Sequence, residues 1–97
     1  MSINAKVAKA LGHKVEYNPN GNLMIVAGPY HTIKLPNYER SLDSCTELLK
    51  ELSIHQVSVY FDPTVEEWRV EGTGIHLSDP SLPQAVCKGF LALKQGK

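Results

Sequence analysis

Apolar residues recur every three or four positions in three stretches of the chain, which is the spacing of one helix face. In the first stretch Ile3, Val7 and Leu11 follow Ser2, a residue type that caps helices, and Gly12 comes next as a natural stop. The pattern predicts a short helix with one apolar face.

The second stretch begins at Ser41 or Ser44, either of which can cap a helix, and Glu47 completes a capping box with Ser44. Its apolar positions form one contiguous sector: Leu42, Cys45, Leu48, Leu49 and Leu52. We expect a helix that packs this sector against a core while Lys50 and Glu51 face water.

The third stretch, SLPQAVCKGFLAL, holds more apolar residues than one helix face can carry. Ser81 and Gln84 are spaced as a capping box. The main stripe consists of Leu82, Ala85, Val86, Gly89, Phe90 and Leu93. Cys87 and Leu91 form a second stripe, so this helix is either wedged between a sheet and a helix or uses them for self-association. We favour the first, because burial within the domain is the commoner fate of apolar surface.

A first hairpin is predicted after the first helix. Val15 and Tyr17 alternate on one strand, residues 18–21 supply a turn, and residues 23–27 form the return strand. Residues 23–26 are apolar at every position, so we expect this strand to be covered on both faces.

A second hairpin is predicted ahead of the third helix. Apolar residues share one face of its two strands, at Val57, Val59, Phe61, Trp68 and Val70. The opposite face carries Ser58, Tyr60, Glu67, Arg69 and Glu71. The following GTGIHL segment predicts a short third strand.

The segment GPYHTIKLPNY, residues 28–38, contains two prolines, Pro29 and Pro36, and is predicted to be a connector that runs to the second helix. We therefore expect a single domain over residues 1–97 of the α+β class. It should contain one largely antiparallel sheet of three to five strands, with helices on both faces.

Charge narrows the range of partners. Ten basic and ten acidic residues give a formal net charge of zero, and no run of Lys or Arg is present. Nucleic acid and bare membrane are therefore not expected partners. No stretch has the form of a signal peptide or approaches the roughly 20 apolar residues of a membrane span. Two distant cysteines do not make a disulfide framework, so we expect a cytoplasmic protein with reduced thiols.

Residues that carry chemistry are scattered. The histidines, His13, His31, His55 and His76, lie in separate segments without metal-ligand spacing, so no metal or other cofactor is expected. Cys45 and Cys87 lie on or beside apolar stripes, where a thiol is better explained as a small buried hydrophobe than as a nucleophile. Glu67 and Glu71 share a strand face that is more typical of the solvated side of a hairpin. No catalytic residue is predicted, and the chain is not expected to be an enzyme.

Recognition of a binding partner is a stronger candidate function than metal binding or catalysis. Tyr60 and Arg69 on the outer face of the second hairpin, with Tyr30 and His31 in the connector, supply the aromatic and guanidinium groups that dominate interface energetics. The alternative is that Tyr60 packs under a helix and Arg69 pairs with a neighbouring glutamate.

Several segments resemble the phage ABA sandwich domain family, small proteins of phages and prophages. LPNYERSLDSCTELLKEL, residues 35–52, is similar to the family's Leu-Pro, aromatic and helix-start pattern, and LPQAVCKGFLAL to its closing Ala-Ile-Cys helix. Trp68 stands on the return strand as the family's tryptophan does, and ALGHKVEY is similar to its opening helix, glycine and first strand. The chain departs from the pattern at Glu39 and Arg40, where members have Ser and Thr, and at Val86, where they have Ile.

The resemblance implies a layered α/β/α sandwich, a phage or prophage setting and no assigned function or site residues. With the other observations, it predicts a small non-enzymatic accessory protein in the host cytoplasm that binds a protein partner or another copy of itself. The alternative is a protein that binds or sequesters a nucleotide-like small molecule, with a counter-defence role. Its pocket would lie between the sheet and the connector, where Arg69 or His31 meets an anion.

Overall fold

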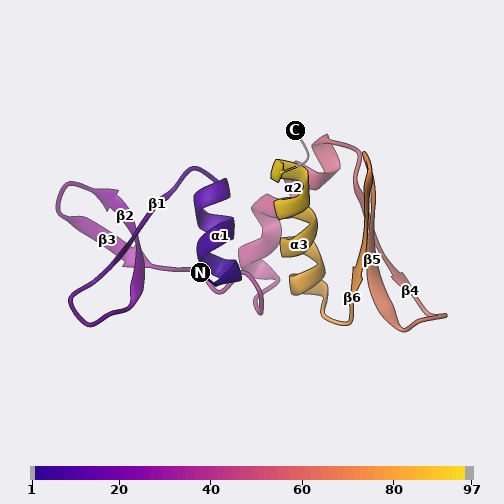
Figure 1. Ribbon diagram of the computed structural model, residues 1–97, viewed down its shortest axis with the longest axis horizontal. Helices are drawn as coiled ribbons and strands as arrows, with labels where there is room; N and C mark the ends of the chain where they lie inside the picture. Colours follow the sequence, from indigo (N-terminus) through magenta and orange to yellow (C-terminus); the bar gives the residue numbers. More distant parts are fainter. Residues whose placement is uncertain (1, 96–97) are drawn as a thin grey trace.

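Three helices lie between two antiparallel sheets in the computed structural model, which describes residues 2–95 (Figure 1). The elements are α1 (Ile3–Ala10), β1 (Lys14–Tyr17), β2 (Leu23–Gly28), β3 (His31–Lys34), the 3-10 turn η1 (Asp43–Cys45), α2 (Thr46–Ile54), β4 (Ser58–Asp62), β5 (Glu67–Gly72), β6 (Ile75–Asp79) and α3 (Leu82–Gln95). The molecule is elongated, 48 × 26 × 20 Å. The expected α+β class and antiparallel pairing are confirmed.

The strands form two three-stranded sheets instead of the expected single sheet, in the orders β1-β2-β3 and β4-β5-β6. Each set of strands is joined by short turns, so neighbours in sequence satisfy one another's backbone hydrogen bonds. No strand within residues 2–95 bridges the two sets. The layers therefore run sheet, helices, sheet, and each sheet has helices on one side (Figure 1). This corrects the expectation of helices on both faces of one sheet.

The first sheet contains a strand where the sequence predicted a connector. β3 lies between Pro29 and Pro36 and pairs with β2, with Ile33 opposite Ile25. The two prolines flank the strand rather than interrupt it, so both leave its ladder intact. Tyr30 occupies the turn between β2 and β3.

The first sheet also corrects the expectation that β2 is covered on both faces. Ile25 is buried on the face toward α1, where Val15 and Leu35 also contact the core. Met24 and Val26 project to the other face and are half-buried. Their neighbours across the ladder are Lys34 and Lys14, whose aliphatic stems can shield them without a second helical layer.

Side-chain caps explain where two helices begin. Ser2 Oγ accepts a hydrogen bond from the Ala5 N–H at 3.2 Å, and Ser81 Oγ accepts one from the Gln84 N–H at 3.5 Å, both as predicted. Ser41 Oγ accepts from the Ser44 N–H at the start of η1. Ser44 does not cap α2, which continues from η1 with Cys45 as its first flanking residue.

The core is centred on α3, which packs against α1, α2, β5 and β6. Its second stripe points into this core: Cys87 is fully buried, and Leu91 is half-buried against the same cluster. The interpretation of SLPQAVCKGFLAL as a helix wedged between a sheet and neighbouring helices is therefore confirmed. As a correction to the self-association stripe, Cys87 has no exposed surface to offer a second chain.

Candidate functional site

The second sheet leaves one face uncovered, which we call the outer face. It consists of Ser58, Tyr60, Asp62, Glu67, Arg69, Glu71, His76 and Ser78, one side of every strand in the observed register. The alternate residues Val70 and Ile75 are buried toward the helices. Because side chains alternate along a strand, burial of one set fixes the other set toward solvent. Figure 1 shows the helices on the opposite side of this sheet.

Arg69 organises the centre of the outer face. Its Nε donates a hydrogen bond to Asp62 Oδ2 at 2.7 Å, and its Nη1 lies 3.5 Å from Glu71 Oε2. Tyr60, directly opposite Arg69 in the ladder, donates from its hydroxyl to Glu71 Oε1 at 3.0 Å. Four side chains from β4 and β5 are therefore joined in one network.

The network sets the protonation states of its members. The hydrogen bond from Arg69 lowers the pKa of Asp62, and the Thr64 N–H, which donates to Asp62 Oδ1 at 2.9 Å, lowers it further. The hydrogen bond to Asp62 raises the pKa of Arg69, and the bond to Glu71 raises the pKa of Tyr60. At neutral pH the carboxylate of Asp62 and the guanidinium are thus charged and the phenol keeps its proton. None of these three groups is tuned to exchange a proton at that pH, and the contacts of the network hold all three in fixed orientations.

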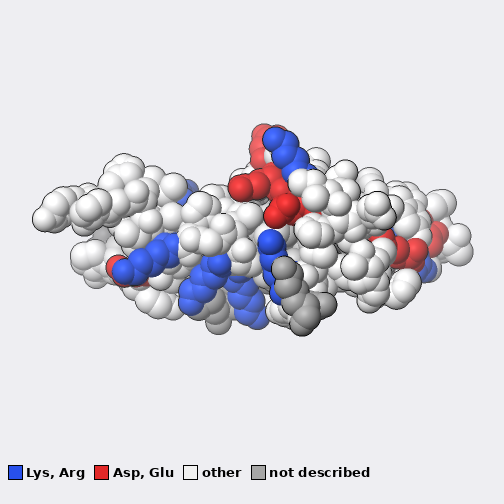
Figure 2. All heavy atoms as spheres, turned by 90° about the horizontal axis from the view of Figure 1, so that it is seen from above, with Lys and Arg blue, Asp and Glu red and all other residues white. Residues whose placement is uncertain are grey.

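The outer face is acidic. Its three carboxylates, Asp62, Glu67 and Glu71, outnumber its one guanidinium, Arg69. Figure 2 shows acidic side chains, with a smaller basic contribution, at the end of the molecule formed by this sheet. A surface of this charge complements a basic partner.

The four predicted binding residues do not converge. Tyr60 and Arg69 lie together on the outer face, whereas Tyr30 and His31 are exposed in and beside the β2–β3 turn of the first sheet. The two sheets form opposite ends of the molecule (Figure 1). Arg69 pairs with Glu71, as the alternative interpretation expected, but Tyr60 is 42% exposed and does not pack under a helix.

The two thiols lie in the core. Cys45 and Cys87 are both free and fully buried, and the Cys45 thiol donates to the backbone carbonyl of Tyr38 at 3.0 Å. Burial raises the pKa of Cys45, and it raises that of Cys87 to about 12. Neither thiol is available as a nucleophile or as a ligand. Within residues 2–95 no group of three or more His, Cys, Asp or Glu side chains is placed to hold a metal ion.

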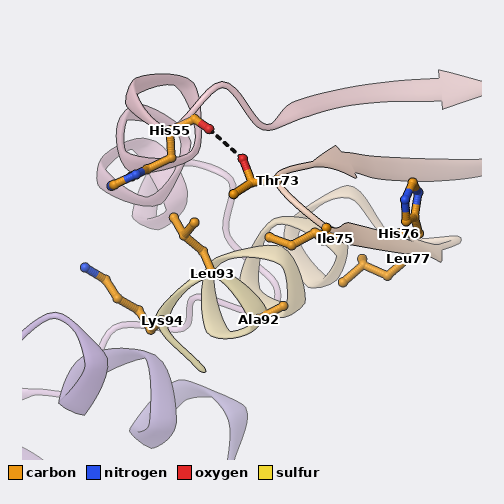
Figure 3. Close-up of a pocket in the computed structure, with 9 residues that line it drawn as sticks. His55, Thr73, Ile75, His76, Leu77, Ala92, Leu93 and Lys94 are labelled. Atoms are coloured by element: carbon orange, nitrogen blue, oxygen red, sulfur yellow. Dashed lines mark hydrogen bonds between the residues drawn. The ribbon is translucent and has the colours of Figure 1, made fainter. Parts of the chain in front are cut away.

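A cavity of about 480 Å³ lies where the end of α3 meets β6 and the end of α2, a feature that the sequence did not reveal. Ile75, Leu77 and Leu93 supply apolar walls (Figure 3). Its residues come from three separate segments with no shared motif, which explains why sequence reasoning missed it.

The titratable side chains around this cavity are His55, His76 and Lys94. His55 and Lys94 lie at its edge, and His76 points to the other side of β6 from Leu77 (Figure 3). Lys94 Nζ is 3.5 Å from Glu51 Oε1 and 5.4 Å from the ring centre of Phe90. The Lys94 ammonium is thus already partly neutralised by an acidic neighbour.

The pocket predicted between the sheet and the connector at residues 30–36 is not formed as expected, because β3 occupies that segment and belongs to the sheet. A cavity of about 540 Å³ is lined by Leu23, Met24, Lys34 and Leu35 beside Asn22. It is bounded by one cation, Lys34, rather than by Arg69 or His31, because Arg69 belongs to the other sheet and His31 lies at the far end of β3.

Comparison with known proteins finds a solved structure that shares the fold of this chain. No family model and no curated protein matches the chain, so the resemblance to the phage ABA sandwich family is not confirmed. Each helix within residues 2–95 falls short of the length and hydrophobicity that crossing a bilayer requires. The chain is similar to the crystal structure of a phage protein from Bacillus cereus ATCC 14579, with 23% identity and a TM-score of 0.68, over 93% of this chain and 86% of that one. The fold is therefore one that a phage protein also adopts.

Proposed function

We propose that the chain is a small phage or prophage accessory protein that acts by binding a protein partner in the cytoplasm of the bacterial host, without catalysing a reaction. The shared fold with a Bacillus cereus phage protein supports the phage setting. The binding role rests on the outer face of the second sheet.

The observation that carries the proposal is the Arg69-centred network on an uncovered sheet face. Tyr60 and Arg69 are held in place by Glu71 and Asp62 while part of each side chain faces solvent. A side chain that is already ordered loses less conformational entropy on binding, and Tyr and Arg are the residue types most enriched at interface hot spots. The acidic surroundings favour a partner that presents Lys or Arg side chains.

The chemistry of the described residues supports binding over catalysis. The Asp62 carboxylate is occupied by Arg69 and the Thr64 N–H, and the thiols of Cys45 and Cys87 are buried with raised pKa values. A catalytic acid, base or nucleophile needs an accessible group whose pKa lies near the working pH.

The proposal is tested by capture from a lysate of infected host cells with the immobilised wild-type chain and two variants. Glu67→Lys reverses one charge on the outer face, and Glu16→Lys makes the same change on strand β1 of the other sheet. A partner specific to the outer face is retained by wild type and by Glu16→Lys and is lost with Glu67→Lys. Its binding also weakens as salt is raised, because charge pairs at an interface rim are screened. Equal retention of every captured protein by the two variants would count against the proposal.

A second function, binding of a small anionic molecule, is favoured by the cavity beside Lys94. Its apolar walls and the Lys94 and His55 side chains at its edge suit a ligand with a flat apolar part and a phosphate. Thermal denaturation with nucleotides and with inorganic phosphate tests this function. A rise in melting temperature with a nucleotide that Lys94→Gln abolishes would favour it, and no rise at millimolar nucleotide would exclude it.

A further inference from the structure

The two sheets present four edge strands, and they differ in how they are protected. Exposed edges usually carry charges, especially Lys, or are covered by another element. β1 contains Lys14 and β3 contains Lys34, while β6 packs against α3 and ends at Asp79, which is held by Lys88. β4 has the sequence SVYFD, without Lys, Arg or Pro, and its one charge is at its last residue.

Exposed apolar side chains lie on this edge strand and beyond both of its ends. Tyr60 and Phe61 on β4 are 42% and 46% exposed, Val65 in the following turn is 47% exposed, and Ile54 at the end of α2 is 70% exposed. These four residues are half of the large exposed hydrophobic side chains in the described part of the chain. An unprotected, apolar edge strand is a template for pairing with another strand.

We propose that a second copy of the chain pairs with this edge, so that two β4 strands join antiparallel across a two-fold axis at Tyr60. The two second sheets then form one six-stranded sheet. Tyr60 is the middle residue of the five-residue strand, so this register overlaps the two strands completely. The proposal rests on the proposed function and names one partner for the same sheet.

This register places complementary side chains of the two copies opposite each other. With the axis at Tyr60, Val59 faces the partner's Phe61, and Ser58 faces the partner's Asp62. Aromatic and β-branched side chains are a favourable cross-strand pair, and a hydroxyl opposite a carboxylate is a donor opposite an acceptor. No two like charges are brought opposite each other, and the formal net charge of zero removes general repulsion between copies.

A groove lies where the partner's Phe61 would project. The space between α2 and the start of β4 measures about 480 Å³ and is lined by Leu49, Leu52, Val57 and Val59 among others. Val59 belongs both to this groove and to the pairing register. The partner's Phe61, opposite Val59, therefore reaches the groove mouth from the same side of the sheet.

Pairing would also enlarge the outer face. Three strands spaced about 4.8 Å apart, with five residues rising about 3.4 Å each, cover roughly 240 Å². A stable protein interface takes about 800 Å² from each partner. Joining two outer faces side by side doubles the surface that a protein partner can contact.

The experiment measures the mass of the wild-type chain by sedimentation equilibrium between about 10 and about 500 µM, a range that brackets the micromolar affinity of small interfaces. Two variants, Tyr60→Lys and Tyr60→Glu, each place like charges across the proposed axis, while their mixture places opposite charges there. Tyr17→Lys makes the same change at an exposed tyrosine of the first sheet. Far-ultraviolet circular dichroism confirms that each variant is folded.

We expect the wild-type chain to be a dimer and each Tyr60 variant alone to dimerise at least about tenfold more weakly. Mixing the two variants should restore dimerisation, because opposite charges then face each other across the axis. Tyr17→Lys should dimerise like wild type. A second pair of variants should change the strength of dimerisation in opposite directions. Ser58→Lys, which faces the partner's Asp62, should strengthen the dimer, and Ser58→Glu should weaken it.

A wild-type chain that is monomeric at every concentration would overturn the proposal. A dimer that neither Tyr60 variant weakens, or that Tyr17→Lys also weakens, would do the same. So would a mixture of the two Tyr60 variants that does not recover dimerisation. The proposed function is tested separately, because capture of a partner by the outer face is measured with Glu67→Lys and Glu16→Lys, which leave Tyr60 and Ser58 unchanged. A monomeric chain that still shows outer-face capture would remove the dimer alone.

Discussion

Gly89 of α3 lies directly against Val70 of β5: a Cβ atom built on Gly89 would lie 2.7 Å from Cγ1 of Val70. Val70 is fully buried, so its methyl groups have no free space into which to move. The glycine therefore sets how closely the last helix approaches the second sheet. This close contact holds the sheet that carries the outer face against the helical layer.

We predict that Gly89→Ala lowers the free energy of unfolding by about 1 kcal/mol. Overpacking typically costs about 1–3 kcal/mol, and the gain in helix propensity offsets about 1 kcal/mol of it. Denaturant unfolding of Gly89→Ala, Val70→Ala and the double variant measures the coupling. The double variant should be less destabilised than the sum of the single variants, because Val70→Ala removes the obstructing methyl groups. Gly28→Ala is the matched control, since a Cβ there would meet His31 Cβ at an ordinary 3.9 Å. Strict additivity would contradict the contact.

The Asp79–Lys88 pair should make stability depend on pH. Asp79 is 6% exposed; its Oδ2 accepts from Lys88 Nζ at 2.6 Å and its Oδ1 accepts from the Ser81 N–H at 2.8 Å. Burial by itself raises the pKa of Asp79, but the two hydrogen bonds outweigh it and the pKa is lowered. A lowered folded-state pKa means that the stabilisation is present above the unfolded-state pKa, about 3.9, and is lost as the pH falls through the folded-state value.

Asp79→Asn should therefore be less stable than wild type by about 1–2 kcal/mol at pH 7, and the difference should shrink below about pH 4. Denaturant unfolding across this pH range gives the measurement. Asp43→Asn, at an exposed carboxylate in η1, is the control and should change stability little at any pH. A difference for Asp79→Asn that stays constant down to pH 2 would be inconsistent with the lowered pKa.

The thiols should resist labelling in the folded chain. Burial raises the pKa of Cys87 to about 12 and also raises that of Cys45, so little thiolate forms at pH 8 and reagents do not reach it. Reaction with a chromogenic disulfide reagent should be negligible in native buffer, whereas both cysteines of the sequence should react in guanidinium chloride. Rapid modification of either thiol under native conditions would show that the core around α3 is open.

The first sheet should exchange its amide protons faster than the second. Among its three strands, which the structure describes in full, Ile25 is the one buried side chain, and the sheet contacts the helical layer through α1. Few buried apolar contacts lower the free energy of local opening. Hydrogen exchange should show less protection at Ile25 than at Val70 in the middle of β5. Equal protection would mean that the two sheets unfold together.

Local pattern predicted most elements of this fold. The helical spacing of Ile3, Val7 and Leu11 and the cap at Ser2 identified α1, and the alternation from Val57 to Val70 identified the hairpin of β4 and β5. The same alternation placed Tyr60 and Arg69 on an uncovered face. These features depend on residues close in sequence, which is why sequence reasoning found them.

The arrangement of the elements in space was harder to predict from the sequence. An apolar run such as residues 23–26 indicates that side chains are shielded but does not say what shields them, and the stems of Lys14 and Lys34 can serve where a second helical layer was expected. Likewise, β3 has no alternating pattern because all four of its residues are exposed. The cavity beside Lys94 depends on three segments that meet only in the folded chain.

We propose the outer face around Arg69 as the surface that binds the partner. The most direct measurement is a map of backbone amide resonances in the nitrogen-15-labelled chain as the captured partner is added. We expect the amide resonances of Tyr60, Arg69 and Glu71 to shift or broaden while those of β1 to β3 stay unchanged. Changes concentrated at Tyr30 and His31, or around the cavity beside Lys94, with the outer face unaffected, would contradict it.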